Sequence, residues 1–216
     1  MTQRAFDLLI FDWDGTLSDS VFRIAECMQL AAREHQLPVP SHQQAANIVG
    51  LGLSEAINRL FSSTDPLLID AVSRTYSRHY RAKNKGPCHF FPHVLEVLQQ
   101  LKQQGYKLAV ATGKSEAGLL RELTASGLDD FFHATRCADQ TASKPNPLML
   151  SQLLDLTQLH PCQAIMIGDT EYDMEMAVNA DMPRLAVSYG AHSIDRLQKY
   201  RPIACIGCFS EIINYI

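Results

Sequence analysis

Four short, mainly apolar runs recur along the chain. The first covers residues 8–11 and is followed directly by Asp12, and the others cover residues 107–112, 164–168 and 185–188. A short uninterrupted apolar run is typical of a strand that is buried on both faces of a sheet. The four runs therefore predict strands of one buried sheet.

The segments between these runs have the periodicity of helices. In residues 93–104 the apolar side chains fall at helical spacing, and Gly105 follows as a C-cap. Residues 115–126 and 147–157 predict two further helices, and the second begins with Pro147, a favoured first helical residue. Strands that alternate with helices predict an α/β fold with a Rossmann-like parallel sheet and helices on its faces.

Residues 18–85 break this alternation, because they contain helical patterns and no convincing strand. A capping box, Ser41-x-x-Gln44, opens one of the helices, and Asp65-Pro66 opens the longest. We expect four helices in this segment. The first has an apolar face at Val21, Ile24, Ala25, Met28 and Ala32. The second runs from Ser41 to a stop at Gly50, a short third helix lies near 54–61, and the fourth begins at Asp65. The segment is thus predicted to be a helical insert directly after the first strand.

The charge balance and the hydrophobic content exclude several classes of protein. The chain has 216 residues, with 19 basic and 23 acidic residues, so it lacks the basic surplus of most nucleic-acid-binding proteins. No apolar run approaches the roughly 20 residues that span a bilayer, and the N-terminus does not resemble a signal peptide. These features predict a cytoplasmic protein that binds neither nucleic acid nor membrane.

Six cysteines are scattered along the chain, a distribution that indicates reduced thiols. Cys205-Ile-Gly-Cys208 is a lone C-x-x-C motif, and a zinc site would need about two more ligands. We therefore expect Cys205 to lie on a C-terminal strand, with Cys208 just after it.

Polar residues follow three of the predicted strands, where ligands of parallel sheets bind. The first strand runs into Asp12-Trp13-Asp14-Gly15-Thr16, and its turn offers backbone N–H groups to an anion. The strand at 107–112 ends in Thr112-Gly113-Lys114, which combines a hydroxyl, an amide and an ammonium. The strand at 164–168 leads to Asp169-Thr170-Glu171-Tyr172-Asp173.

A fourth element, Lys144, stands just before the helix that Pro147 opens. Taken singly, each element has an ordinary explanation, such as a helix cap at Asp12 or a solvated lysine in a loop. Their occurrence together, at strand ends of one parallel sheet, indicates a site that binds phosphate rather than four separate coincidences.

The ordered set Asp12-x-Asp14-Gly15-Thr16, Thr112, Lys144 and Gly168-Asp169-x-x-x-Asp173 resembles the haloacid dehalogenase superfamily, and most closely its phosphoglycolate phosphatase-like branch. The resemblance covers essentially the whole chain. It implies an α/β catalytic core of residues 1–17 and 86–216, and it makes the helical insert of residues 18–85 a small cap.

The resemblance also implies a role for each residue of the motifs. Asp12 is the nucleophile that attacks phosphorus, and Asp14 protonates the leaving oxygen and then activates water. Thr112, Gly113 and Lys144 bind the phosphoryl oxygens. The cofactor is Mg²⁺, bound by the carboxylates of Asp12 and Asp169 and by the backbone carbonyl of Asp14, with Asp173 supporting it directly or through water.

Two positions depart from the usual motifs of the superfamily. Trp13 replaces a smaller apolar residue, and we expect its backbone amide rather than its side chain to face the phosphate. Phe90-Phe91-Pro92-His93 stands where relatives often have Tyr-Pro-Gly, at the hinge between core and cap. Because of the second departure, the substrate of a relative is a less direct guide to the substrate of this chain.

Within the cap, the sequence offers two candidate contacts with substrate. Gly50-Leu51-Gly52 is either a loop that faces the active site or a simple helix stop. Arg74, Arg78, Arg81 and Lys85 form one stripe of a helix, which is either a solvated face or a surface that binds an acidic substrate. None of the eight histidines lies within a motif.

Asp14 favours hydrolysis of a phosphate ester, because the superfamily's dehalogenases lack this second aspartate. We therefore expect a Mg²⁺-dependent phosphatase for a small, phosphoglycolate-like monoester, acting as a monomer or homodimer. Two alternatives remain: a phosphomutase that forms the same aspartyl-phosphate, and an inactive binding protein on the same fold.

Overall fold

The structure is a computed structural model that describes residues 4–216. Its centre is a six-stranded sheet with all neighbouring strands parallel, in the order β3-β2-β1-β4-β5-β6. The strands are β1 (Leu8–Phe11), β2 (Lys107–Thr112), β3 (Ala134–Cys137), β4 (Ala164–Gly168), β5 (Arg184–Val187) and β6 (Cys205–Ile206). This sheet confirms the predicted Rossmann-like α/β fold.

Strand β1 is central because it pairs with β2 on one side and with β4 on the other. Its four side chains are wholly buried and alternate between two hydrophobic clusters, with Leu9 and Phe11 on one face and Leu8 and Ile10 on the other. Burial on both faces explains why this strand is a continuous apolar run.

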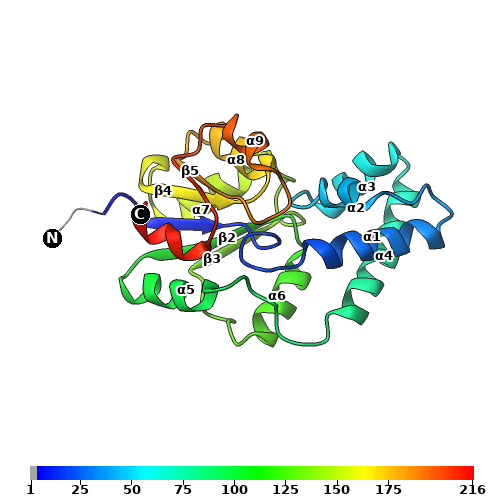
Figure 1. The fold of residues 1–216 in the computed structure, drawn as a ribbon, viewed down its shortest axis with the longest axis horizontal. Helices are drawn as coiled ribbons and strands as arrows, with labels where there is room; N and C mark the ends of the chain where they lie inside the picture. Colours follow the sequence, from blue (N-terminus) through cyan, green and yellow to red (C-terminus); the bar gives the residue numbers. More distant parts are fainter. Residues whose placement is uncertain (1–3) are drawn as a thin grey trace.

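Helices cover both faces of the sheet (Figure 1). Helices α5 (Val94–Gln103) and α6 (Glu116–Ala125) pack on the face of Leu9, together with the 3₁₀ turn η2 (Phe209–Asn214). Helices α7 (Leu148–Thr157) and α8 (Glu171–Asn179) pack on the opposite face. Helix α9 (Ile194–Gln198) and the 3₁₀ turn η1 (Pro161–Gln163) complete this part of the chain.

The segment after β1 forms a lobe of helices at one end of the sheet (Figure 1). It consists of α1 (Val21–Glu34), α2 (His42–Ala46), α3 (Leu53–Phe61) and α4 (Pro66–Lys83). These helices share their own hydrophobic cluster. The lobe confirms the predicted helical cap after the first strand, while its limits at residues 18 and 85 stay a prediction.

Hydrogen bonds at Asn47 join the cap to the core. The backbone carbonyl of Asn47 accepts a hydrogen bond from the Tyr172 hydroxyl at 2.8 Å and contacts His192 Nε2 at 3.3 Å. Its side-chain oxygen accepts a hydrogen bond from Arg196. Tyr172 and His192 are almost fully buried, so this junction is specific.

The apolar pattern predicted β1, β2, β4 and β5 to within one residue, and Cys205 does lie on a strand, with Cys208 after it. Strand β3 was missed because it lies at the sheet edge, and its sequence Ala-Thr-Arg-Cys has no apolar run. Helix α2 ends at Ala46, earlier than the predicted stop at Gly50. No helix of the described residues is long and apolar enough to cross a membrane.

Candidate active site

The predicted site residues lie at the carboxyl ends of three adjacent strands. Asp12 directly follows β1, Thr112 ends β2, and Asp169 directly follows β4. Since β1 lies between β2 and β4, parallel pairing brings the three strand ends to one edge of the sheet. The order of the strands therefore assembles the motifs that lie more than 150 residues apart in the sequence.

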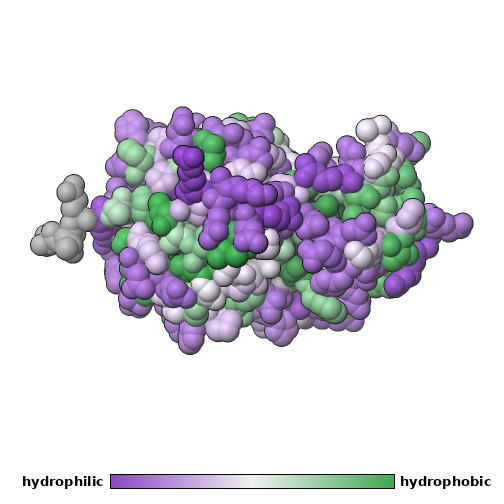
Figure 2. All heavy atoms as spheres, turned by 45° about the horizontal axis from the view of Figure 1, so that its top comes forward, coloured by the Kyte–Doolittle hydropathy of each residue, from purple (hydrophilic) through white to green (hydrophobic). Residues whose placement is uncertain are grey.

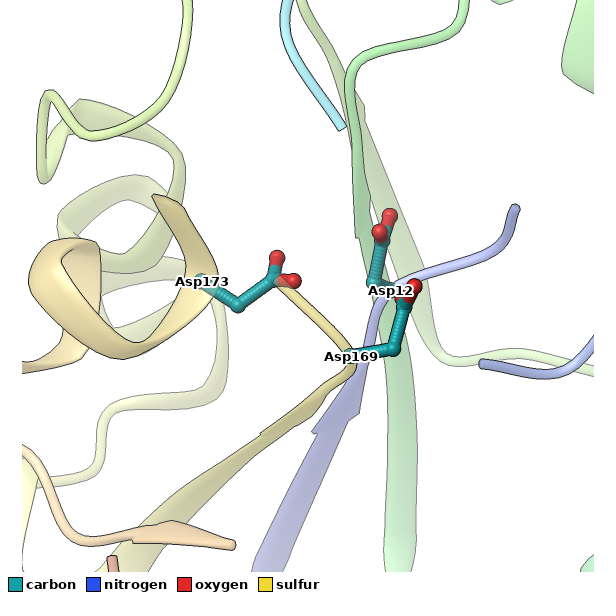
Figure 3. A group of neighbouring side chains, drawn as sticks. All are labelled: Asp12, Asp169 and Asp173. Atoms are coloured by element: carbon teal, nitrogen blue, oxygen red, sulfur yellow. The ribbon is translucent and has the colours of Figure 1, made fainter. Parts of the chain in front are cut away.

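Three buried carboxylates converge at this edge (Figure 3). Asp12, Asp169 and Asp173 each offer an oxygen within 4.8 Å of the others, and all three are fully buried. Asp12 Oδ2 is buried and has no hydrogen-bond partner among residues 4–216. A cluster of oxygen donors with one unsatisfied atom fits a divalent cation such as Mg²⁺.

The pKa values of these carboxyls reflect the same clustering. Burial, opposed by Lys144, raises the pKa of Asp12 well above its ordinary value, and the charges of Asp173 and Asp169 raise it further. Burial and the charge of Asp173 raise the pKa of Asp169 to about 7. A bound cation would offset this repulsion and keep both groups ionised.

Asp169 is oriented by two donors and by a close turn. Its Oδ1 accepts a hydrogen bond from Thr16 Oγ1 at 2.8 Å, and its Oδ2 accepts one from the Ala191 amide at 2.7 Å. Gly15 has φ +86°, and a Cβ there would lie 2.2 Å from Asp169 Oδ2. Gly15 is therefore required both by its backbone conformation and by the nearby carboxylate.

Lys144 is buried between two of the carboxylates. Its Nζ lies 2.8 Å from Asp12 Oδ1 and 2.6 Å from Asp173 Oδ1. Although burial alone lowers the pKa of this ammonium, Asp12 and Asp173 raise it above its ordinary value, so it stays charged. Asp173 Oδ2 meanwhile accepts hydrogen bonds from the backbone and hydroxyl of Thr170 at the start of α8. Asp173 thus fixes Lys144 relative to a rigid helix end.

Asp14 has a separate set of partners. Ser20 Oγ donates a hydrogen bond to Asp14 Oδ1 at 2.6 Å, and Lys114 Nζ lies 3.1 Å from Asp14 Oδ2. The residue is 7% exposed and lines the cavity described below. A carboxyl that is positioned but reachable from the cavity suits proton transfer to a bound molecule.

A buried carboxylate that the sequence analysis did not single out, Glu122, connects these groups. Glu122 Oε2 accepts a hydrogen bond from Trp13 Nε1 at 2.5 Å, and Oε1 lies 3.2 Å from Lys114 Nζ. Tyr80 and Asn84, at the C-terminal end of cap helix α4, donate hydrogen bonds to Oε1 at 2.9 Å each. Glu122 therefore links Trp13, Lys114 and the cap.

A cavity of about 410 Å³ lies between the core and the cap. Its lining includes Asp12, Asp14, Thr112 and Gly113 from the core, and apolar side chains from α1 to α4. In the space-filling view the surface is notched where the two lobes meet (Figure 2). Asp12, Asp14, Thr112 and Gly113 thus face the same cavity as the cap.

Gly50 and Leu51 line this cavity, and α2 ends at Ala46, before Gly50. Both observations favour the loop interpretation over that of a simple helix stop. A Cβ at Gly113 would lie 2.4 Å from the carbonyl oxygens of Gly50 and Leu51. The Gly52 amide also donates a hydrogen bond to Ser143 Oγ at 2.9 Å. Gly113 therefore permits this cap loop to approach the core backbone closely.

The basic stripe is divided by the structure. Arg81 and Lys85 line the cavity, whereas Arg74 and Arg78 do not. Arg74 pairs with Asp70 on its own helix at 2.6 Å, and Arg78 pairs with Glu34 of α1. Arg74 and Arg78 thus have acidic partners on the cap surface and do not line the cavity that contains Asp12 and Asp14.

Sequence reasoning found the motif residues but missed the groups that orient them. Lys114 was expected to bind phosphate, yet its ammonium lies between Asp14 and Glu122. Trp13 Nε1 was given no role, and Glu122 was missed altogether. A signal existed for Glu122, because it occupies the same helical stripe as Leu119 and Leu123, both buried. A charged residue on an apolar face requires polar partners in the core.

The chain is similar to named proteins over nearly its full length. It is 33% identical over 211 residues to a probable phosphatase, IndB, of Dickeya dadantii, covering 96% of this chain and 92% of that protein. It is 31% identical to a phosphoglycolate phosphatase of Vibrio vulnificus strain CMCP6, covering 100% and 98%.

Similarity extends to solved structures and to a family. A haloacid dehalogenase-like hydrolase from Bacteroides fragilis superposes with a TM-score of 0.88 at 25% identity, covering 96% of this chain and 99% of that one. Residues 9–187 match the family described as haloacid dehalogenase-like hydrolase. The chain therefore belongs to the haloacid dehalogenase-like hydrolases, in their phosphoglycolate phosphatase-like branch, and its enzyme class is that of a phosphatase.

Proposed function

We propose that the protein hydrolyses a small phosphate monoester through an aspartyl-phosphate on Asp12, with Mg²⁺ as cofactor. The observation that carries this proposal is Asp12 itself. Asp12 lines the cavity, and one of its oxygens is held by Lys144 at 2.8 Å. Its other oxygen has no hydrogen-bond partner within the described part of the chain. A fixed carboxylate with a free oxygen is the arrangement that a nucleophile requires.

The first half-reaction transfers the phosphoryl group to the protein. An oxygen of Asp12 attacks phosphorus, and the bond from phosphorus to the ester oxygen breaks. Asp14 donates its proton to that leaving oxygen, so the alcohol departs neutral. Lys144 and Thr112, with the amide at Gly113, neutralise and orient the phosphoryl oxygens during the transfer.

The second half-reaction regenerates the enzyme. Asp14, now ionised, accepts a proton from a water molecule, and that water attacks phosphorus. The bond from phosphorus to the oxygen of Asp12 breaks, and inorganic phosphate leaves. Ser20 and Lys114 hold the two oxygens of Asp14 in place between the two steps.

The carboxylates of Asp12 and Asp169 and the backbone carbonyl of Asp14 would hold Mg²⁺. Asp173 would support the ion directly or through water, and its contact with Lys144 at 2.6 Å would also hold that lysine in place. When bound, the ion supplies positive charge to the phosphoryl group. The rest of the site would position that group against Asp12.

The test is direct detection of the modified aspartate. Protein quenched during turnover of p-nitrophenyl phosphate and reduced with borohydride should contain homoserine in place of Asp12, visible as a mass change in the peptide that carries it. Thr16→Ser, which keeps the hydroxyl, is a matched positive control. Turnover without any modification of Asp12 would contradict the proposed intermediate.

We also propose a small phosphorylated metabolite as substrate, a cytoplasmic location and a monomeric or homodimeric protein. The named substrate of the Vibrio vulnificus relative supports a small phosphate ester. The helical cap supports the same size class, because it encloses the cavity over Asp12. Light scattering on the purified protein would distinguish a monomer from a dimer.

A further inference from the structure

The cap side of the cavity is apolar to an extent that a two-carbon acid does not explain. Its wall includes Ile24, Met28, Ile48, Val49, Leu51 and Leu53. At about 410 Å³ the cavity falls within the range of roughly 300–1,000 Å³ typical of sites for larger organic ligands. A glycolate group would leave most of this wall in contact with water.

Basic residues line the same cavity but come from exposed positions. Arg81 and Lys85 lie at the end of α4 and just after it, and Arg121 lies on α6 of the core. None of the three takes part in an ion pair among residues 4–216. Asp12 and Asp14, by contrast, are buried. The cavity is thus lined by the buried Asp12 and Asp14, by apolar cap side chains and, at its exposed opening, by basic residues.

The cationic groups nearer the reaction centre are not available for a second anion. Lys144 is paired with Asp12 and Asp173, and Lys114 is paired with Asp14 and Glu122. Among the described residues, an anionic group on the leaving alcohol would therefore find lining cations without an ion pair at the opening. Because Arg81, Lys85 and Arg121 are exposed while Asp12 and Asp14 are buried, such an alcohol must be long enough to reach from the ester oxygen to the opening.

We propose that the preferred substrate is a phosphate monoester whose alcohol has an apolar body and ends in an anionic group, rather than a compact acid such as phosphoglycolate. The proposal rests on the phosphatase function proposed above. The apolar body displaces water from the cap wall, and the terminal anion binds at Arg81, Lys85 and Arg121.

The experiment compares two series of phosphate monoesters, both with chains of two to eight carbons. One series ends in a carboxylate, and its two-carbon member is phosphoglycolate; the other is uncharged. We expect kcat/KM to rise roughly two- to fourfold per added methylene until the wall is covered. At six carbons the carboxylate should give a several-fold advantage that Arg121→Gln and Arg81→Gln each reduce.

A pair of variants in one helix serves as the structural control. Leu53→Asn places a polar group in the cavity wall and should lower the gain per methylene. Leu60→Asn alters a half-buried leucine of the same helix that does not line the cavity, and should retain the gain. A preference for phosphoglycolate over all longer members, or equal kcat/KM across both series, would overturn the proposal.

Calorimetry separates this proposal from the phosphatase function. The matching alkylphosphonates cannot be hydrolysed, and their affinity should rise with chain length and with a terminal carboxylate. Chain-dependent affinity without turnover of any ester would refute the proposed function but support this substrate class. Turnover combined with an affinity that does not depend on chain length would support the phosphatase function but refute this substrate class.

Discussion

The core and the cap enclose the cavity with different kinds of contact. On the core side, Asp12, Asp14 and Lys144 are each fixed by charged or hydrogen-bonded partners at 2.6 to 3.1 Å. On the cap side, the aliphatic part of the wall comes from α1, α3 and the loop between α2 and α3. Hydrogen bonds and ion pairs are directional, whereas apolar contact is not. The core side can therefore specify a reaction, while the cap side can select only the size and polarity of a leaving group.

The largest effect should come from the core side. Asp12→Asn removes the nucleophile but keeps the size of the side chain and one oxygen, so we expect kcat to fall by roughly 10⁴-fold or more with the fold intact. Phosphate release under single-turnover conditions measures the loss, and circular dichroism checks the fold. A folded Asp12→Asn protein with near-normal turnover would exclude Asp12 as the nucleophile.

Removal of the metal should be nearly as damaging. Excess chelator is expected to abolish activity, and added Mg²⁺ should restore it. Asp169→Ala should raise the Mg²⁺ concentration for half-maximal activity roughly 10-fold or more, because it deletes one of few carboxylate donors. Asp139→Ala alters an exposed aspartate outside the cluster and provides the control. Full activity in chelator would show that the cluster does not serve a metal.

Asp14→Asn should lower kcat on an alkyl phosphate by about 10²- to 10⁴-fold, the usual contribution of a general acid or base. A good leaving group such as p-nitrophenolate needs little protonation, so formation of the aspartyl-phosphate should be less impaired with that ester. Burst kinetics separate the two half-reactions. Equal losses in the first half-reaction for both esters would argue against the acid role.

The sequence predicted which core residues meet at one edge of the sheet, because these residues directly follow or end apolar strands. Each apolar run located a strand, and the polar residues after it could be assigned to one edge of the sheet. The orienting partners were harder to predict, since the contact of Glu122 with Trp13 joins residues 109 positions apart. Nothing local to Glu122 indicates that it meets Tyr80 and Asn84 from the cap.

The cap was predictable only as helices. Its amphipathic patterns located α1, α3 and α4, but they did not show which apolar side chains face the cavity and which face the cap's own core. Likewise, the spacing of Arg74, Arg78 and Arg81 placed them on one stripe of α4, but the acidic partners of the first two are set by tertiary and local packing. The side chains that we propose to select the substrate therefore lie in the part of the chain where sequence patterns are least specific.

Glu122 allows the junction between core and cap to be tested. Glu122→Gln removes the charge that faces Lys114, and we expect the free energy of unfolding to fall by about 1–3 kcal/mol. Trp13 is the only tryptophan, so its single indole N–H resonance in NMR reports the junction directly and should shift. Tyr80→Phe deletes one cap hydrogen bond and should cost about 0.5–1.5 kcal/mol. An indole resonance that does not move in Glu122→Gln would contradict this contact.

The smallest effects should come from the outer part of the basic stripe. Arg74→Ala should leave KM for an acidic ester within about twofold of wild type, because this arginine is paired with Asp70, and both side chains are more than half exposed. Arg78→Ala should behave alike, since its partner is Glu34 on the cap surface.

Arg81→Ala removes a cation that lines the cavity, and KM for the acidic ester should rise roughly two- to fivefold. A matched uncharged ester measures the part of each change that is independent of substrate charge. If Arg74→Ala and Arg81→Ala raise KM equally for the acidic ester alone, the whole stripe acts through its long-range field, and direct contact at the opening is not the basis of selectivity.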